Sequence, residues 1–222
     1  MKSQGWKTEV KLSKSESKIP VVDGVHLHSV YNPIKEAESF ASQNKELLTK
    51  KNTVLIFGLG FGYHVKEAEV QMRKKFGDQY LLWVIEPNLD VYQGALKEGL
   101  IKPSKNLRIT CCSSVESFFQ DVPLMNYLSM SPSVIPHPAS FNLYNNFFKS
   151  FMTYKASKLS SEYSKFVKDE ELRNYLIADH ENSSLETIWE EVKHKNKITK
   201  HDLLLQGLEA VITQRKEEVI NE

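Results

Sequence analysis

The chain has 222 residues, of which 41% are hydrophobic and 26% are charged, proportions typical of a folded globular protein. Its 29 Lys and Arg residues balance 28 Asp and Glu residues, so the net charge of +1 lacks the basic excess of a nucleic-acid-binding domain. The sequence has no apolar leader and no apolar run near the ~20 residues that span a bilayer, so we expect a cytoplasmic protein that binds neither membranes nor nucleic acids.

Residues 1–31 predict a small antiparallel β cap. Over residues 6–12, Trp, Thr, Val and Leu alternate with charged residues, which is the period-two pattern of a half-exposed strand. Residues 18–31 predict a second pair of strands that turns at Asp23-Gly24, a dipeptide favoured in hairpins.

Residues 32–150 alternate between strand and helix patterns. The strand segments are apolar runs without polar alternation, which favours a parallel sheet covered on both faces. The predicted strands are 53–57, 80–85 and 107–112, and the predicted helices are 32–48, 63–76, 89–100 and 115–119. Prolines between 121 and 140 leave room for one more short strand. We therefore predict an α/β fold with a mostly parallel, doubly wound sheet, Rossmann-like and close to the methyltransferase type.

The adjacent cysteines Cys111 and Cys112 lie at the end of the third predicted strand of this sheet. Neighbouring cysteines rarely form a strain-free bridge with each other, which argues against a disulfide framework. We expect both to be buried thiols in a reducing compartment.

Residues 151–222 are charged and helical in pattern and predict a C-terminal helical segment. Its last helix carries an apolar stripe formed by Leu203, Leu204, Leu208, Val211 and Ile212. Such a stripe is buried either against the chain's own sheet or against another chain. We favour the second burial, which implies a protein partner or a homo-oligomer.

A glycine-rich turn follows the first strand of the predicted sheet. Gly58, Gly60 and Gly62 form a GxGxG pattern, His64 opens the following helix, and Glu86 ends the next strand. Glycines let the backbone approach a ligand, a helix start attracts anions, and an acidic residue at this place binds ribose hydroxyls in nucleotide-binding folds. These five residues form the predicted cofactor-binding site, for a nucleotide, a nucleotide-sugar or S-adenosylmethionine. If they line such a site, Gly60→Val should abolish binding with little loss of fold.

Two features weaken a methyltransferase assignment. The position two residues before the first glycine is Ile56, where methyltransferases commonly carry an acidic residue. The segment 130–138, which would follow the fourth strand and hold a substrate, contains no carboxylate. No catalytic residue is therefore assigned.

The remaining histidines predict no metal site. His26 and His28 lie two residues apart and would face the same side of a strand, but their spacing provides no third ligand. Packing or hydrogen bonding of one ring near the helix start at Asn32 is the favoured interpretation. His137, between two prolines, either orients a loop or reaches the cleft, and the sequence does not decide between these roles.

Four segments together resemble the amino-terminal Rossmann-like domain of the motility accessory factor (Maf) proteins, bacterial flagellin glycosyltransferases. The segments are VHLHSVYNPIKEAESF, VLIFGLGFGYHVKEA, WVIEPN and VIPHPASFNLYNNFF, within residues 20–155. The most specific part is the pairing of HLHSVYNPIKEA with GLGFGYH. In the family, sugar transfer from a cytidine nucleotide is assigned to a later catalytic domain with a GxGPS-like motif, and no such motif occurs in this sequence.

The resemblance implies a Rossmann-like accessory domain of flagellin or surface glycosylation that holds a nucleotide or nucleotide-sugar. We expect such a chain not to be a complete enzyme by itself, and a glycosyltransferase or flagellin-related partner would supply the chemistry. Two alternatives stay open. One is a divergent S-adenosylmethionine-dependent methyltransferase, and the other is a non-catalytic protein-interaction module whose glycine turn is vestigial.

Overall fold

A computed structural model describes residues 5–111, 114–119, 121–155, 157 and 159–220, and the side chains of residues 163, 166, 179, 211, 212 and 214–220 are outside the described set. The chain divides into two compact units, Met1–Tyr154 and Lys155–Glu222. The predicted boundary lay after residue 150.

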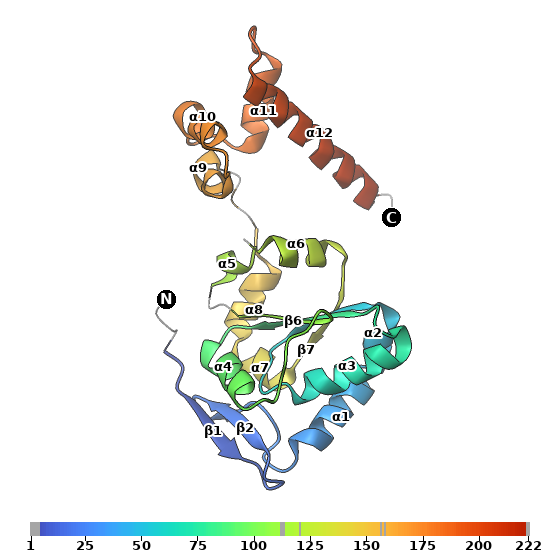
Figure 1. The fold of residues 1–222 in the computed structure, drawn as a ribbon. Coiled ribbons are helices and arrows are strands. Elements are labelled where there is room, and N and C mark those ends of the chain that lie inside the picture. Colours follow the sequence, from blue (N-terminus) through green and yellow to red (C-terminus); the bar gives the residue numbers. More distant parts are fainter. Residues whose placement is uncertain (1–4, 112–113, 120, 156, 158, 221–222) are drawn as a thin grey trace. The chain divides into compact units, whose positions relative to one another are not determined.

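The first unit begins with an antiparallel sheet of order β1-β2-β3, the predicted cap (Figure 1). Its strands are β1 (Thr8–Leu12), β2 (Lys18–Val22) and β3 (Val25–His26). Asp23 and Gly24 form the turn between β2 and β3, and both have positive φ angles, of 48° and 81°. This is the conformation that a tight hairpin requires, which explains the Asp-Gly dipeptide.

The second sheet of this unit is parallel and has the strand order β6-β5-β4-β7. Its strands are β4 (Thr53–Phe57), β5 (Leu81–Glu86), β6 (Leu107–Cys111) and β7 (Ser133–Pro136). The helices of this unit are α1 (Pro33–Gln43), α2 (Lys45–Lys50), α3 (Tyr63–Phe76), α4 (Leu89–Lys97), α5 (Val115–Phe119), α6 (Val122–Ser129), α7 (Pro138–Leu143) and α8 (Asn145–Met152).

The parallel sheet is covered by helices on both faces (Figure 1). Every residue of β4 is buried. Val54 and Ile56 belong to the apolar core shared with α1, α2 and α3, whereas Leu55 and Phe57 belong to the core shared with α5, α6 and α8. Because side chains alternate across a strand, a sheet with two covered faces needs an uninterrupted apolar run, and β4 supplies one.

The predicted α/β fold class is confirmed. Asn32 caps α1 by accepting hydrogen bonds from the backbone N–H groups of Ile34 and Lys35, and Gly77 ends α3 with a φ angle of 60°. The further strand expected between residues 121 and 140 is β7, preceded by α6. Cys111 ends β6 and is half-buried, whereas Cys112, predicted to continue this strand, lies outside the described residues.

The second unit is helical. It consists of α9 (Ser160–Tyr163), a 3₁₀ turn (Ser164–Phe166), α10 (Glu170–His180), α11 (Leu185–Lys193) and α12 (Lys200–Ile220). Asp202 is fully buried at the start of α12, where it accepts hydrogen bonds from Lys195 Nζ at 2.8 Å and from the Thr199 backbone N–H at 2.7 Å. Burial opposes ionisation of this carboxyl, but these donors together hold the pKa of Asp202 below its usual range.

The predicted stripe of α12 is not the face that packs within the second unit, and its burial against another chain stays a prediction. Leu205 is buried in a core with Leu176, Ile188, Trp189 and Val192 from α10 and α11. Leu203, Leu204 and Leu208 of the predicted stripe are exposed. The side chains of Val211 and Ile212 lie outside the described set. Three consecutive leucines at 203–205 allow either face of the helix to be apolar, so the sequence pattern did not fix the buried one.

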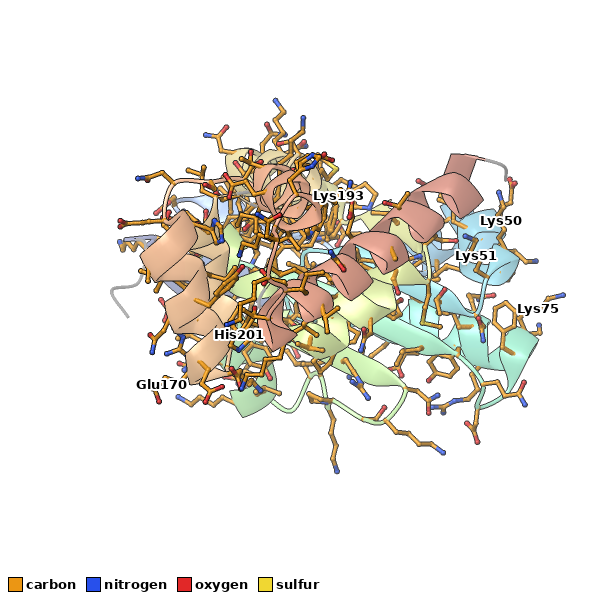
Figure 2. The ribbon with its side chains drawn as sticks, turned by 90° about the horizontal axis from the view of Figure 1, so that it is seen from above. Lys50, Lys51, Lys75, Glu170, Lys193 and His201 are labelled. Atoms are coloured by element: carbon orange, nitrogen blue, oxygen red, sulfur yellow. The ribbon has the colours of Figure 1, made fainter. Side chains whose placement is uncertain are left out.

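Apart from buried carboxyl groups such as that of Asp202, charged side chains lie mostly on the outside of both units, as the labelled Lys50 and Lys75 of the first unit and Glu170 and Lys193 of the second illustrate (Figure 2). Across the described residues, no helix combines the length and the apolar character needed to cross a bilayer.

The adjacent leucines Leu204 and Leu205 offer a matched test of the buried face of α12. Leu205→Ala should destabilise the second unit by about 2–4 kcal/mol, because it leaves a cavity in the core against Trp189. Leu204→Ala should change the stability by about 0.5 kcal/mol or less, because Leu204 is exposed. Hydrogen exchange of α10 and α11 peptides measures both effects. Equal loss of protection in the two variants would contradict this assignment.

Candidate functional site

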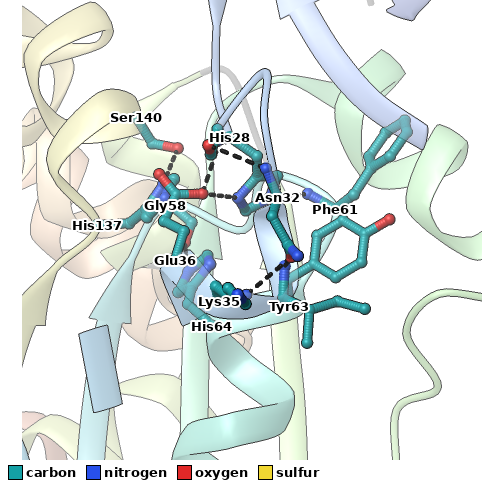
Figure 3. A network of polar contacts seen from close by, with 12 residues as sticks. His28, Asn32, Lys35, Glu36, Gly58, Phe61, Tyr63, His64, His137 and Ser140 are labelled. Carbon is teal, nitrogen blue, oxygen red and sulfur yellow. Dashed lines mark hydrogen bonds and ion pairs between the residues drawn. The ribbon is translucent and has the colours of Figure 1, made fainter. Parts of the chain in front are cut away.

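The candidate site lies at the carboxyl ends of β4 and β7. From β4 the chain proceeds to β5 and β6 on one side and then returns to place β7 on the other side of β4. In open α/β sheets, ligands bind in the crevice where the strand order reverses in this way. Three chain segments meet at this point: the glycine turn after β4, the loop after β3, and the start of α7 after β7 (Figure 3).

The glycine turn faces side chains of the same chain. Gly58 and Gly60 have positive φ angles, of 95° and 51°, a conformation that glycine adopts readily. A Cβ atom on Gly58 would lie 2.2 Å from Ser140 Cβ, and one on Gly60 would lie 2.5 Å from His28 Nε2. Because these glycines have no side chains, His28 and Ser140, which come from opposite ends of the unit's sequence, can pack against the turn.

Glu86, at the end of β5, holds the same turn from the opposite side. Its carboxyl group is fully buried and accepts hydrogen bonds from the backbone N–H of Leu59 at 2.8 Å and of Asn88 at 3.0 Å. Burial raises the pKa of Glu86 to about 7, and the hydrogen bonds from the backbone oppose this rise. Both carboxyl oxygens are therefore engaged within the chain.

His28 connects the β cap to the glycine turn. Its Nε2 atom accepts a hydrogen bond from the Phe61 backbone N–H at 2.9 Å, and its Nδ1 atom lies 3.4 Å from Glu36 Oε2. Glu36, on α1, also accepts a hydrogen bond from the Ser29 backbone N–H at 2.8 Å. Partial burial opposes ionisation of this carboxyl, but the contacts with His28 and Ser29 lower the pKa of Glu36 below its usual value. The imidazole of His28 thus takes its proton on Nδ1 and faces a carboxylate.

His64 and His137 stack on each other beside His28. Their ring planes are 6° apart, with centroids 4.0 Å apart, and both rings are buried. His64 Nε2 lies 3.0 Å from the Gly58 carbonyl oxygen, and His137 Nδ1 lies 2.8 Å from Ser140 Oγ. Burial lowers the pKa of His64 to about 3, with a further contribution from His28. Burial likewise holds the pKa of His137 well below the usual value, so both imidazoles are neutral at physiological pH.

A small cavity opens beside these two rings. It has a volume of about 310 Å³ and is lined by Glu36, Phe40, Gln43, His64 and His137, among others. A second and larger hollow, of about 770 Å³, shares no lining residue with it and has Trp6, Phe147 and Tyr154 among its aromatic walls. The smaller cavity gives solvent and small ligands a route to the histidines.

The predicted cofactor residues are only partly brought together. Gly58, Gly60 and His64 meet at the crevice, whereas Gly62 faces Ile101, whose Cδ1 atom would lie 3.0 Å from a Cβ on that glycine. Glu86 lies beneath the turn and contacts its backbone rather than the crevice. Nucleotide binding by this set is what the sequence predicts, whereas in the structure the Leu59 and Phe61 N–H groups and the Glu86 carboxyl group are engaged within the chain. In the structure, His28 already fills the space in front of Gly60. Gly60→Val is therefore expected to destabilise the fold, contrary to the expectation from the sequence.

Sequence reasoning missed the meeting of His28, His64 and His137, and the roles of Glu36 and Ser140. The sequence shows no third ligand near the pair His26 and His28. The fold instead brings His64 and His137 to His28 from distant segments. His26, on β3, is not part of the described cluster. In the sequence, His64 follows the glycine turn and His137 lies between two prolines, but no neighbouring residue of His28 indicates that it meets them.

Comparisons with known proteins add little to this geometry. No protein-family model matches the sequence, and no curated protein matches it. Among solved structures, the chain is similar to the crystal structure of MNMC2 from Aquifex aeolicus, with 15% identity and a TM-score of 0.36. The match covers 52% of this chain and 46% of that chain. A likeness at this level carries no inference about ligand or activity.

Alanine substitutions at Gly60 and Gly99 separate two contributions to the free energy of unfolding: backbone strain and the filling of the turn. Both have positive φ, but a Cβ on Gly99 would meet nothing within 4 Å. Gly99→Ala should cost about 1 kcal/mol of stability from strain alone. Gly60→Ala should cost about 1–3 kcal/mol more, because His28 must move and give up its bond to Phe61. Urea denaturation followed by tryptophan fluorescence measures both, and equal costs would show that His28 does not occupy the turn.

Proposed function

We propose that this chain is an accessory protein of flagellin or surface glycosylation, which works with a partner glycosyltransferase and performs no group transfer alone. The resemblance of its β-cap, glycine-turn and histidine-proline segments to Maf proteins supports the glycosylation assignment. The glycine turn supports the accessory role, because the backbone N–H groups and the carboxyl group that would bind a nucleotide there are hydrogen-bonded within the chain.

The backbone donors of the turn are the strongest support for this proposal. A Rossmann-like turn binds a ligand through free backbone N–H groups and an acidic residue at the end of the next strand. Here the Leu59 N–H donates to Glu86, the Phe61 N–H donates to His28, and the second oxygen of Glu86 accepts from Asn88. A nucleotide would have to displace His28 to reach the Phe61 N–H, and it would have to break the Leu59–Glu86 hydrogen bond to reach the other two groups.

The same contacts weigh against the methyltransferase alternative. S-adenosylmethionine would need the carboxyl group of Glu86 for its ribose, and this group is fully buried with both oxygens engaged. The segment after β7 offers Ser140 and His137 but no carboxylate. The interaction-module alternative differs from our proposal only in its biological setting and is compatible with the same geometry.

Calorimetry tests the occupied turn directly. Full-length protein titrated with S-adenosylmethionine, S-adenosylhomocysteine, and cytidine mono- and diphosphate should show no binding stronger than about 0.1 mM. Tighter binding of S-adenosylmethionine would replace the proposal with the methyltransferase alternative. Tighter binding of a cytidine nucleotide would restore nucleotide binding to the accessory domain, and a Trp6→Ala variant would then show whether the larger hollow is the site.

The glycosylation assignment is tested in the organism that encodes the chain. Deleting the gene should remove glycan mass from flagellin or from the major surface proteins, because the partner transferase would lack its accessory protein. Intact-protein mass spectrometry of these proteins is the measurement, with re-expression of the wild-type chain as the control. Unchanged masses after deletion would contradict the assignment without affecting the conclusions about the turn.

A further inference from the structure

The histidine cluster of the first unit has a property that the accessory role does not use. His28, His64 and His137 are all buried, and one ring nitrogen from each lies within 4.8 Å of the others. The three residues come from three separate segments, namely the loop after β3, the start of α3 and the loop after β7. We propose that these three imidazoles bind one divalent transition-metal ion, with Zn²⁺ as the ion whose ligand preference they fit.

His64 provides the first argument. Since a carbonyl oxygen only accepts hydrogen bonds, the Nε2 atom that lies 3.0 Å from Gly58 O carries the proton of this imidazole. The lone pair is therefore on Nδ1, which is buried and has no hydrogen-bond partner among the described residues. A buried acceptor without a partner costs free energy, and a metal ion would satisfy it. A histidine whose other nitrogen donates to a backbone carbonyl is the usual arrangement of a metal ligand.

His137 and His28 are held in comparable ways. If the Nδ1 atom of His137 donates to Ser140 Oγ, at 2.8 Å, its Nε2 lone pair is available to a metal. His28 has partners on both nitrogens, the Phe61 N–H and the Glu36 carboxylate, so metal binding would replace one of these two contacts. Glu36 lines the cavity together with His64 and His137, and its contact with His28 Nδ1 at 3.4 Å makes it a carboxylate partner of that imidazole.

The distances allow this assignment with a movement of the rings, because the stacked planes of His64 and His137, 6° apart, must tilt for their lone pairs to meet at one ion. Zinc–nitrogen bonds of about 2.0–2.1 Å in a tetrahedral site place ligand atoms about 3.4 Å apart. The widest pair in the cluster would therefore close by at most about 1.4 Å relative to the 4.8 Å limit. The adjoining cavity of about 310 Å³ provides space for this movement and a path for the ion. Three histidines with a carboxylate or water in the fourth position is a common zinc coordination.

Metal titration of the full-length protein tests the proposal. Protein treated with a chelator and then desalted should bind one equivalent of Zn²⁺, and its melting temperature should rise with Zn²⁺ concentration. Co²⁺ in place of Zn²⁺ should give the visible absorption of a four-coordinate nitrogen and oxygen site. Wild-type protein that binds neither ion more tightly than about 0.1 mM would overturn the proposal and leave a hydrogen-bonded cluster.

Matched variants locate the ion. His64→Gln should lower Zn²⁺ affinity at least about 100-fold, because even the loss of an outer-shell partner costs 10–100-fold. His26→Ala removes a histidine two residues from His28 that is outside the cluster, and it should leave affinity unchanged. Circular dichroism checks that each variant is folded. If His64→Gln does not fold, Glu36→Gln replaces it, with an expected loss of about 10–100-fold. Unchanged affinity in the folded cluster variant, or equal loss in His26→Ala, would overturn the assignment of the site.

Discussion

The hydrogen bond from the Phe61 backbone N–H to His28 Nε2 joins the two sheets of the first unit. The β cap is fixed by a small core in which Val22 and Leu27 pack against Val91 of α4. The polar anchor at His28 sets where the cap meets the glycine turn, and the absence of a side chain on Gly60 makes the approach possible. The same imidazole also lies 3.4 Å from Glu36 and beside the ring of His137.

The same glycine pattern thus serves two physical roles that a sequence does not distinguish. Glycines at positive φ allow a close approach to the backbone, whether the approaching group is a nucleotide or a side chain of the same protein. Glu86 is equally ambiguous, because a carboxylate at a strand end can bind a ribose or the backbone N–H groups of the neighbouring turn. Only the position of the β cap, which depends on contacts far apart in sequence, decides which role these residues have.

Much of the fold could be predicted from local pattern. The uninterrupted apolar run of β4, the Asn32 cap and the Gly77 stop each follow from interactions within a few residues, and each lies where the pattern placed it. The histidine cluster could not be predicted, because it forms only after β7 is inserted beside β4 and brings His137 to His64. The face of α12 that packs within the second unit could not be predicted for a related reason, since the neighbouring helices select Leu205 from a run of adjacent leucines.

The strand order has a consequence for how the first unit is made. β4 pairs with β5 soon after both are synthesised, but its other edge pairs with β7, much later in the chain, in the register of Val54 with Ser133. Until β7 emerges, β4 exposes the unpaired backbone groups of a strongly apolar strand, which is the kind of edge that recruits other chains into aggregates. Such late, non-local pairing also slows folding. Nascent chains of this protein are therefore most in need of chaperone protection while α4 to α6 are being synthesised.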